Sequence, residues 1–229
     1  MKKITIFGAV IIAIAALVLG LAGCGTDNSP SERPIVCLGD SLTEGFGAST
    51  PGEVDRSKSY PAFLQSKVTA QVINAGISGD TAAGGLARVD RDVVSKDPQT
   101  VIILLGGNDF LQGRPADYTK DDLQAIIDRL RDQDRKIFLA SFIGDSAWES
   151  NMRGKLQGML PSFIDMNIID AHLSEYKKIF SELASENRDV VFIPNIWTGV
   201  SDDQMSDPIH PNAEGYSKIA DTIYNAMRL

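Results

Sequence analysis

Four separate stretches of the chain contain residues that together could hydrolyse an ester. Ser41 follows an apolar run and offers a hydroxyl nucleophile, and Asp207 with His210 could form an oriented general base. Gly79 and Asn108 lie in glycine-containing segments and could supply N–H groups to a negatively charged oxygen. Acyl transfer through a serine needs this combination of nucleophile, base, orienting carboxylate and oxyanion donors.

Each of these signals also has a purely structural interpretation. Ser41 and Glu44 fit the S-x-x-E pattern of a helix capping box, in which the hydroxyl only satisfies a backbone N–H. Glycine and asparagine are common in turns, and a loop histidine such as His210 can be a surface residue. The other histidine, His172, opens an amphipathic segment, and we interpret it as structural or solvent-facing. No G-x-S-x-G motif occurs, so the nucleophile elbow of α/β-hydrolases is absent.

The elements that must position these residues alternate between strand and helix signals. Continuous apolar runs predict five strands buried on both faces, at 34–38, 71–74, 100–105, 136–142 and 190–194. Amphipathic segments between and after them predict helices at 60–70, 81–96, 119–133, 171–187 and 212–227. Thr119–Asp122 looks like a capping-box start for the third of these helices.

The alternation of these elements predicts an α/β fold. A three-layer α/β/α, doubly wound sheet of about five mainly parallel strands fits the order best. Ligands of such sheets bind at the carboxyl ends of the strands. Ser41, Gly79 and Asn108 each follow one of the first three predicted strands, so the fold would gather them at one edge.

Composition and charge exclude several classes of function. The chain has 229 residues, with 22 Lys and Arg against 30 Asp and Glu, for a net charge of −8. Nucleic-acid binding is not expected, because the broad positive field that holds phosphate groups is missing. Two cysteines and two histidines also exclude a disulfide framework and a Cys/His-rich zinc site, so we predict no metal.

The first residues read as a targeting signal. Residues 1–23 combine two early lysines with a long apolar run, as in a secretory signal peptide. Leu21–Ala22–Gly23–Cys24 resembles the lipobox of bacterial lipoproteins, in which the cysteine is acylated; an uncleaved membrane anchor is the alternative. We expect lipidation of Cys24, a flexible tether at 24–33, a single domain at 34–229, and an extracytoplasmic location at a membrane. Cys37, inside an apolar run, is expected to be buried and inert.

The four stretches together resemble the SGNH, or GDSL, hydrolase family. The matching blocks read GDSLTEGFG at 39–47, NAGISGDT at 74–81, GGND at 106–109 and DPIHP at 207–211. They occur in the order typical of the family and span most of the chain. The residues of these blocks are most similar to those of small bacterial extracytoplasmic arylesterases, thioesterases and lysophospholipases.

The resemblance implies a role for each matched residue. Ser41 would be the nucleophile, His210 the general base and then acid, and Asp207 the residue that orients His210. The N–H groups of Ser41 and Gly79 and the Asn108 side chain would form the oxyanion hole. The family fold is a flavodoxin-like sheet. Neither a metal nor an organic cofactor is implied, and no protein partner is required.

The segment 143–170 is longer than in compact family members. Its role affects which substrate is expected more than it affects the chemistry. It carries apolar residues that could form a lid or an acyl-chain wall, or simply pack a helical hairpin onto the core: Trp148, Met152, Leu156, Met159, Leu160, Phe163 and Met166. The main expectation is a serine esterase acting on carboxylic or thio esters. The alternatives are a carbohydrate O-acetyl esterase of envelope or extracellular polysaccharide and a non-catalytic envelope binding protein.

Overall fold

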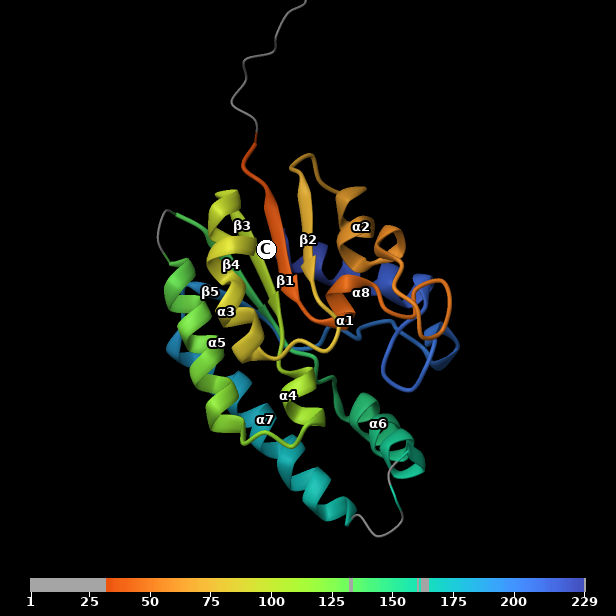
Figure 1. The fold of residues 1–229 in the computed structure, drawn as a ribbon. Helices are drawn as coiled ribbons and strands as arrows, with labels where there is room; N and C mark the ends of the chain where they lie inside the picture. Colours follow the sequence, from red (N-terminus) through yellow and green to blue (C-terminus); the bar gives the residue numbers. More distant parts are fainter. Residues whose placement is uncertain (1–31, 132–133, 160, 162–164, 229) are drawn as a thin grey trace, which may run out of the picture. The chain divides into compact units, whose positions relative to one another are not determined.

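A five-stranded, fully parallel β-sheet forms the centre of the protein (Figure 1). The computed structural model describes residues 32–131, 134–159, 161 and 165–228. The strand order is β2-β1-β3-β4-β5, and the strands are β1 (Ile35–Gly39), β2 (Val72–Gly76), β3 (Thr100–Leu104), β4 (Lys136–Ala140) and β5 (Val190–Ile193). Every residue of β1 and β3 is buried, which explains their continuous apolar runs.

Helices cover both faces of the sheet (Figure 1). On one face α2 (Tyr60–Gln65) packs against α8 (Ala213–Met227), and on the other α3 (Ala82–Asp92), α5 (Ala116–Leu130) and α7 (Met166–Glu186) lie side by side. Three more helices matter for the site, and each is the next helix after β1, β3 or β4: α1 (Ser41–Glu44), α4 (Gly107–Leu111) and α6 (Ser146–Met159). The predicted three-layer α/β fold is therefore confirmed.

The predicted strands agree with the observed ones to within two residues at each end. The helices were predicted less well. The patterns at 60–70 and 81–96 predict continuous helices, but α2 ends at Gln65 and α3 ends at Asp92, and a short 3-10 turn follows at Val94–Lys96. The helices α1 and α4 were not predicted, because four or five residues are too few to show a helical period.

The predicted capping box at Thr119 is wrong. Helix α5 begins three residues earlier, at Ala116, directly after Pro115. Thr119 is fully buried, and its hydroxyl lies 3.3 Å from the Asp109 carboxylate and 3.0 Å from the Tyr176 hydroxyl. Thr119 therefore makes hydrogen bonds to residues of other helices instead of capping the start of its own helix.

The predicted signal peptide, Cys24 and the tether up to residue 31 lie outside the described residues. Residues Glu32–Leu229 form one compact unit. Within the described part of the chain, no helix combines the length and the apolar character needed to cross a membrane. Cys37 is fully buried in β1, and burial raises the pKa of its thiol to about 12, so it is inert as a nucleophile.

The segment 143–170 forms α6 and the first residues of α7, which pack against each other as a helical hairpin. Met152 and Leu156 are buried in the hydrophobic core, and Met166 packs against it. Trp148 stacks on Trp197 with ring centroids 5.8 Å apart. Leu160 and Phe163 lie outside the described residues.

Candidate active site

The site lies at the carboxyl edge of the sheet, beside the strands β1 and β3. In the order β2-β1-β3-β4-β5, the strand that follows β1 in the chain lies on one side of it, and all later strands lie on its other side. Ligands of such sheets bind in the crevice at this switch point, between β1 and β3. Ser41 begins α1 directly after β1, and Asn108 lies in α4 directly after β3. Gly79 lies in the loop after β2, and His210 comes from the loop before α8.

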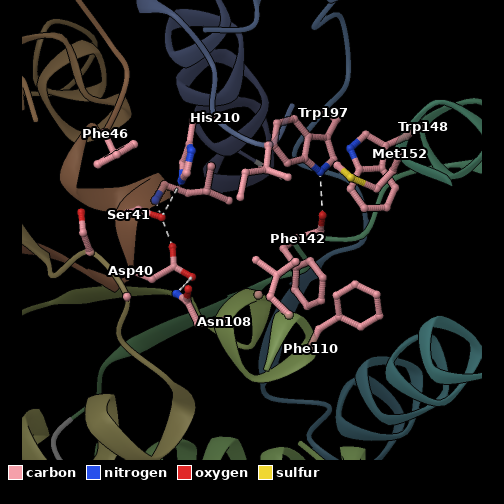
Figure 2. A pocket seen from close by; sticks show the side chains of 16 residues that line it. Asp40, Ser41, Phe46, Asn108, Phe110, Phe142, Trp148, Met152, Trp197 and His210 are labelled. Atoms are coloured by element: carbon pink, nitrogen blue, oxygen red, sulfur yellow. Dashed lines mark hydrogen bonds between the residues drawn. The ribbon is translucent and has the colours of Figure 1, made fainter. Parts of the chain in front are cut away.

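Ser41, His210 and Asp207 form a continuous hydrogen-bonded chain. The Ser41 Oγ lies 3.0 Å from His210 Nε2, although 169 residues separate them in the sequence. The His210 Nδ1 lies 2.7 Å from Asp207 Oδ2. Figure 2 shows the Ser41 hydroxyl and the His210 ring directed at each other at the end of the cavity. A hydroxyl, an imidazole and a carboxylate in this order can transfer the hydroxyl proton to the ring.

The loop 205–211 holds this histidine by its own backbone. The N–H groups of Ile209 and His210 both donate to Asp207 Oδ1, at 2.9 and 2.8 Å. A short β-bridge joins Met205 to Pro211 and closes the loop. Burial alone would raise the pKa of Asp207, but these N–H groups and the His210 ring outweigh burial and lower it, so the carboxylate stays ionised at neutral pH.

Gly79 and Asn108 line the same cavity as Ser41 and His210. Gly79 has φ +82°, a left-handed conformation that favours glycine, and nothing lies within 4 Å of the position that a Cβ would occupy. The Asn108 Nδ2 donates to the backbone oxygen of Asp80 at 2.9 Å and to Asp40 Oδ2 at 3.3 Å. Gly79 and Asn108, which are predicted to form the oxyanion hole together with the Ser41 N–H, therefore lie at the cavity that Ser41 lines.

Apolar side chains form most of the cavity wall. Its volume is about 230 Å³. Figure 2 shows it extending from Ser41 between two groups of side chains, with Trp197, Trp148 and Met152 on one side and Phe110 and Phe142 on the other. Trp148 and Met152 come from α6, so this helix both packs on the core and lines the cavity.

The structural interpretation of Ser41 and Glu44 as a capping box is wrong. The residue that caps α1 is Asp40, whose Oδ1 accepts the Leu42 N–H at 3.0 Å. Aspartate is a strong N-cap, and it frees the Ser41 hydroxyl for His210. Glu44 contacts Ser78, 34 residues away, instead of Ser41.

His172 is largely buried and lies outside the cavity that Ser41 lines. Its ring stacks on Phe110 at 5.2 Å and meets the edge of Tyr176 at 5.0 Å. It contributes to a second cavity of about 360 Å³ between α4, α6 and α7. These contacts agree with the predicted structural role.

Asp40 carries a buried carboxyl group beside the site. It is 3% exposed, and burial raises the pKa of its carboxyl to about 7; the nearby charge of Asp80 acts in the same direction, against the hydrogen bond from Leu42. The unfolded chain would release this proton near the ordinary aspartate pKa of about 3.9. The folded state therefore binds one more proton than the unfolded state between these two values, so its stability falls as pH rises through them.

We expect Asp40→Asn to remove this pH dependence. The wild-type free energy of unfolding should fall relative to that of the variant by about 2–4 kcal/mol between pH 5 and pH 8. Urea unfolding of both proteins at several pH values measures this difference. Asp189→Asn is the matched control: Asp189 pairs with Arg131, which lowers its pKa, so its difference should be flat in this range. If the difference in unfolding free energy between the wild type and Asp40→Asn were also independent of pH, the raised pKa of Asp40 would be contradicted.

The described residues contain no cluster of three His, Cys, Asp or Glu side chains that could hold a metal ion. The cavity side chains are mainly apolar, and the polar groups near Ser41 are hydrogen-bond donors and acceptors suited to an acyl group.

Comparison with known proteins adds independent evidence. Residues 37–218 match the model of the GDSL-like lipase/acylhydrolase family. Esterase TesA of Pseudomonas aeruginosa is 25% identical over 206 residues, which cover 86% of this chain and 89% of that protein. Thioesterase 1/protease 1/lysophospholipase L1 of Escherichia coli is 29% identical over 202 residues, covering 86% of this chain and 84% of that protein.

Solved structures agree on the fold. A crystal structure of TesA superposes with a TM-score of 0.67 at 24% identity, covering 86% of this chain and 98% of that chain. The matched family region contains the stretches that carry Ser41, Gly79, Asn108, Asp207 and His210. The chain belongs to the GDSL-like lipase/acylhydrolase family and is an enzyme that hydrolyses ester bonds.

Proposed function

We propose that the protein hydrolyses carboxylic or thio esters through an acyl-Ser41 intermediate. The observation that carries the proposal is the chain of contacts from Ser41 Oγ to His210 Nε2, at 3.0 Å, and from His210 Nδ1 to Asp207, at 2.7 Å. Ser41 and His210 both line the apolar cavity, where a substrate carbonyl can meet the hydroxyl.

In the first half of the reaction, Ser41 Oγ attacks the carbonyl carbon while His210 Nε2 takes its proton. Asp207 stabilises the imidazolium that forms. The carbonyl oxygen becomes negatively charged and accepts hydrogen bonds from the N–H groups of Ser41 and Gly79. It also accepts one from the Asn108 amide, which exchanges its longer contact, the one with Asp40 at 3.3 Å, for the oxyanion. The bond to the leaving alcohol or thiol then breaks, and His210 returns the proton to that group.

The second half repeats these steps with water. His210 takes a proton from water, the hydroxide oxygen bonds to the acyl carbon, and the bond to Ser41 breaks as His210 gives the proton back to Oγ. No redox partner or further reactant is needed. Each oxyanion donor contributes about 3–4 kcal/mol to lowering the barrier in enzymes of this type.

The cavity wall favours acyl groups longer than acetyl. Aromatic and thioether side chains continue beyond Ser41 for the length of the cavity, and a buried methylene contributes about 0.8 kcal/mol. We expect kcat/KM for p-nitrophenyl esters to rise about three- to fourfold per methylene from acetate until the chain fills the cavity. A maximum at acetate with a sharp drop beyond it would contradict this proposal and would favour the O-acetyl esterase alternative.

Met152→Trp tests whether the α6 wall sets this preference. The larger side chain should fill the cavity and lower the ratio of octanoate to acetate kcat/KM by about tenfold or more, because long chains lose their space. Gln157→Trp, on the exposed side of the same helix, is the matched control and should leave the ratio unchanged. Equal ratios for wild type and Met152→Trp would exclude Met152 from the acyl site.

We also propose that Cys24 is acylated and anchors the domain outside the cytoplasm. This part of the proposal is supported by the sequence of residues 1–24, with its lysine-flanked apolar run and its terminal Leu21–Cys24 motif. A membrane location would suit an enzyme with an apolar acyl cavity, since esters with longer acyl chains partition into lipid.

A further inference from the structure

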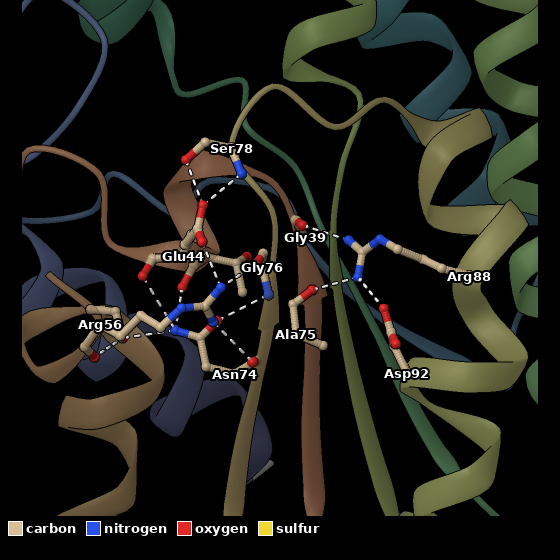
Figure 3. Close-up of polar contacts among 11 residues, drawn as sticks. Gly39, Glu44, Arg56, Asn74, Ala75, Gly76, Ser78, Arg88 and Asp92 are labelled. Atoms are coloured by element: carbon tan, nitrogen blue, oxygen red, sulfur yellow. Dashed lines mark hydrogen bonds and ion pairs between the residues drawn. The ribbon is translucent and has the colours of Figure 1, made fainter. Parts of the chain in front are cut away.

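The loop between β2 and α3 carries Gly79, whose N–H is one of the proposed oxyanion donors. Of its two neighbours, Ser78 is hydrogen-bonded to the Glu44 carboxylate (Figure 3), and the Asp80 carboxylate is paired with Arg88. The position of the Gly79 N–H therefore depends on what holds these two residues.

Glu44 holds Ser78. Its Oε2 accepts both the backbone N–H and the hydroxyl of Ser78, each at 2.7 Å. Its Oε1 accepts from Arg56 Nη2 at 2.5 Å, and Arg56 also donates to the Gly76 carbonyl at 2.9 Å. Glu44 is the last residue of α1, the helix that Ser41 begins. One carboxylate thus joins the Gly79 loop to the Ser41 helix.

Arg88 holds Asp80 on the other side. Its side chain is 7% exposed, and its Nε donates to Asp80 Oδ2 at 2.6 Å. Its Nη1 donates to the Ala75 carbonyl at 2.8 Å and to the Asp92 carboxylate at 3.1 Å, and its Nη2 donates to the Gly39 carbonyl at 2.9 Å (Figure 3). The Asp80 carbonyl accepts from the side chain of Asn108 in α4, another of the proposed oxyanion donors, at 2.9 Å.

We propose that Glu44 is a positioning residue for the reaction at Ser41, because it fixes the Gly79 N–H relative to the Ser41 hydroxyl through Ser78. This inference rests on the proposed function. Glu44 is absent from the residues that line the cavity, so it acts through the loop and not on the substrate.

The groups around Glu44 favour the ionised form of its carboxylate. Burial would raise the pKa of Glu44, but the Ser78 hydroxyl, the Ser78 N–H and the Arg56 guanidinium outweigh it and lower the pKa. The carboxylate therefore stays ionised, and charge-assisted hydrogen bonds of this kind are stronger and more directional than neutral ones. A donor that is fixed before the reaction lowers the barrier more than one that must reorganise.

The test compares Glu44→Ala with Glu44→Gln, by measuring kcat and KM on p-nitrophenyl butyrate. Glu44→Ala should lower kcat by about 10- to 100-fold with KM within about threefold, because the donor is needed mainly in the transition state. Glu44→Gln keeps an oxygen acceptor for Ser78, so its kcat should lie closer to that of the wild type than to that of the alanine variant.

The matched control is Asp221→Ala, which removes the ion pair between Asp221 and Lys67, away from the loop. Its kcat should stay within about twofold of the wild type. Urea unfolding of each variant, at the assay temperature, separates lost stability from lost catalysis. If Glu44→Ala does not fold, Ser78→Ala removes one of the two hydrogen bonds to Glu44 and should lower kcat about two- to tenfold.

Three results would overturn the inference. They are an unchanged kcat in folded Glu44→Ala, a change in KM alone, and equal losses in the alanine and glutamine variants. In the fallback variant, an unchanged kcat in Ser78→Ala would overturn it too. If Ser41→Ala is inactive while Glu44→Ala is fully active, only the positioning role fails. Full activity of Ser41→Ala would instead remove the proposed function on which that role rests.

Discussion

Ser41→Ala is expected to lower kcat for p-nitrophenyl butyrate by at least about 10⁴-fold. The variant has no oxygen to form the acyl intermediate, and loss of the serine from a comparable catalytic triad lowers kcat on the order of 10⁶. Initial rates at saturating substrate, with high enzyme concentration for the variant, measure the effect.

The fold of this variant should be intact. The Ser41 hydroxyl makes its side-chain hydrogen bond to His210, and losing one such bond changes stability by about 1 kcal/mol. Ser49→Ala is the matched control, since Ser49 is exposed and bonds to Asp55, outside the cavity. Wild-type turnover by Ser41→Ala would show that another group attacks the ester.

His210→Ala is expected to lower kcat by about 10⁴- to 10⁶-fold, close to the effect of Ser41→Ala. Without the ring, the Ser41 hydroxyl has no base at 3.0 Å and the leaving group has no acid. The two losses should not add: the double variant should be about as slow as either single variant, because the two residues act as one unit. Kinetics of the three variants side by side measure this.

The chain provides its own control for the histidine. It has two histidines, and the second, His172, stacks on Phe110 and is not among the residues that line the Ser41 cavity. His172→Ala should retain activity within about tenfold of the wild type. A loss in His172→Ala that equals the loss in His210→Ala would mean that the imidazole chemistry has been assigned to the wrong residue.

The sheet could be predicted from the sequence because burial on both faces gives each strand a continuous apolar run. The run Ile35–Leu38 and the run Val101–Leu105 are examples, and both strands are fully buried. The order of the runs, with amphipathic segments between them, then leaves few topologies. Helix ends were harder, because Thr119 and Ser41 fit local capping patterns but bond to residues far along the chain.

The candidate site residues could be predicted because each one lies in a short motif whose residue types suit one step of acyl transfer. The residues around them could not. Glu44 contacts Ser78 and Arg56, and no local pattern pairs these three residues. The cavity wall combines Trp148 with Trp197, which only the folded chain brings together. Such pairs depend on packing between distant elements, which periodicity does not encode.

The position of Asp40 in the sequence indicates its role as a helix cap. An aspartate directly before Ser41 and after a strand is a strong N-cap candidate, and it does cap α1. Its burial beside Asn108 adds a second property, a raised pKa, that only the folded environment creates.

The most direct test of the central claim is to trap the nucleophile. A fluorophosphonate reacts with a serine that a neighbouring base activates, and loses fluoride as the Oγ–P bond forms. Peptide mass spectrometry after complete inactivation should find one adduct, on Ser41, and Ser41→Ala and His210→Ala should remain unlabelled under the same conditions. An adduct on another residue, or full ester hydrolysis by an enzyme that is never labelled at Ser41, would contradict the account.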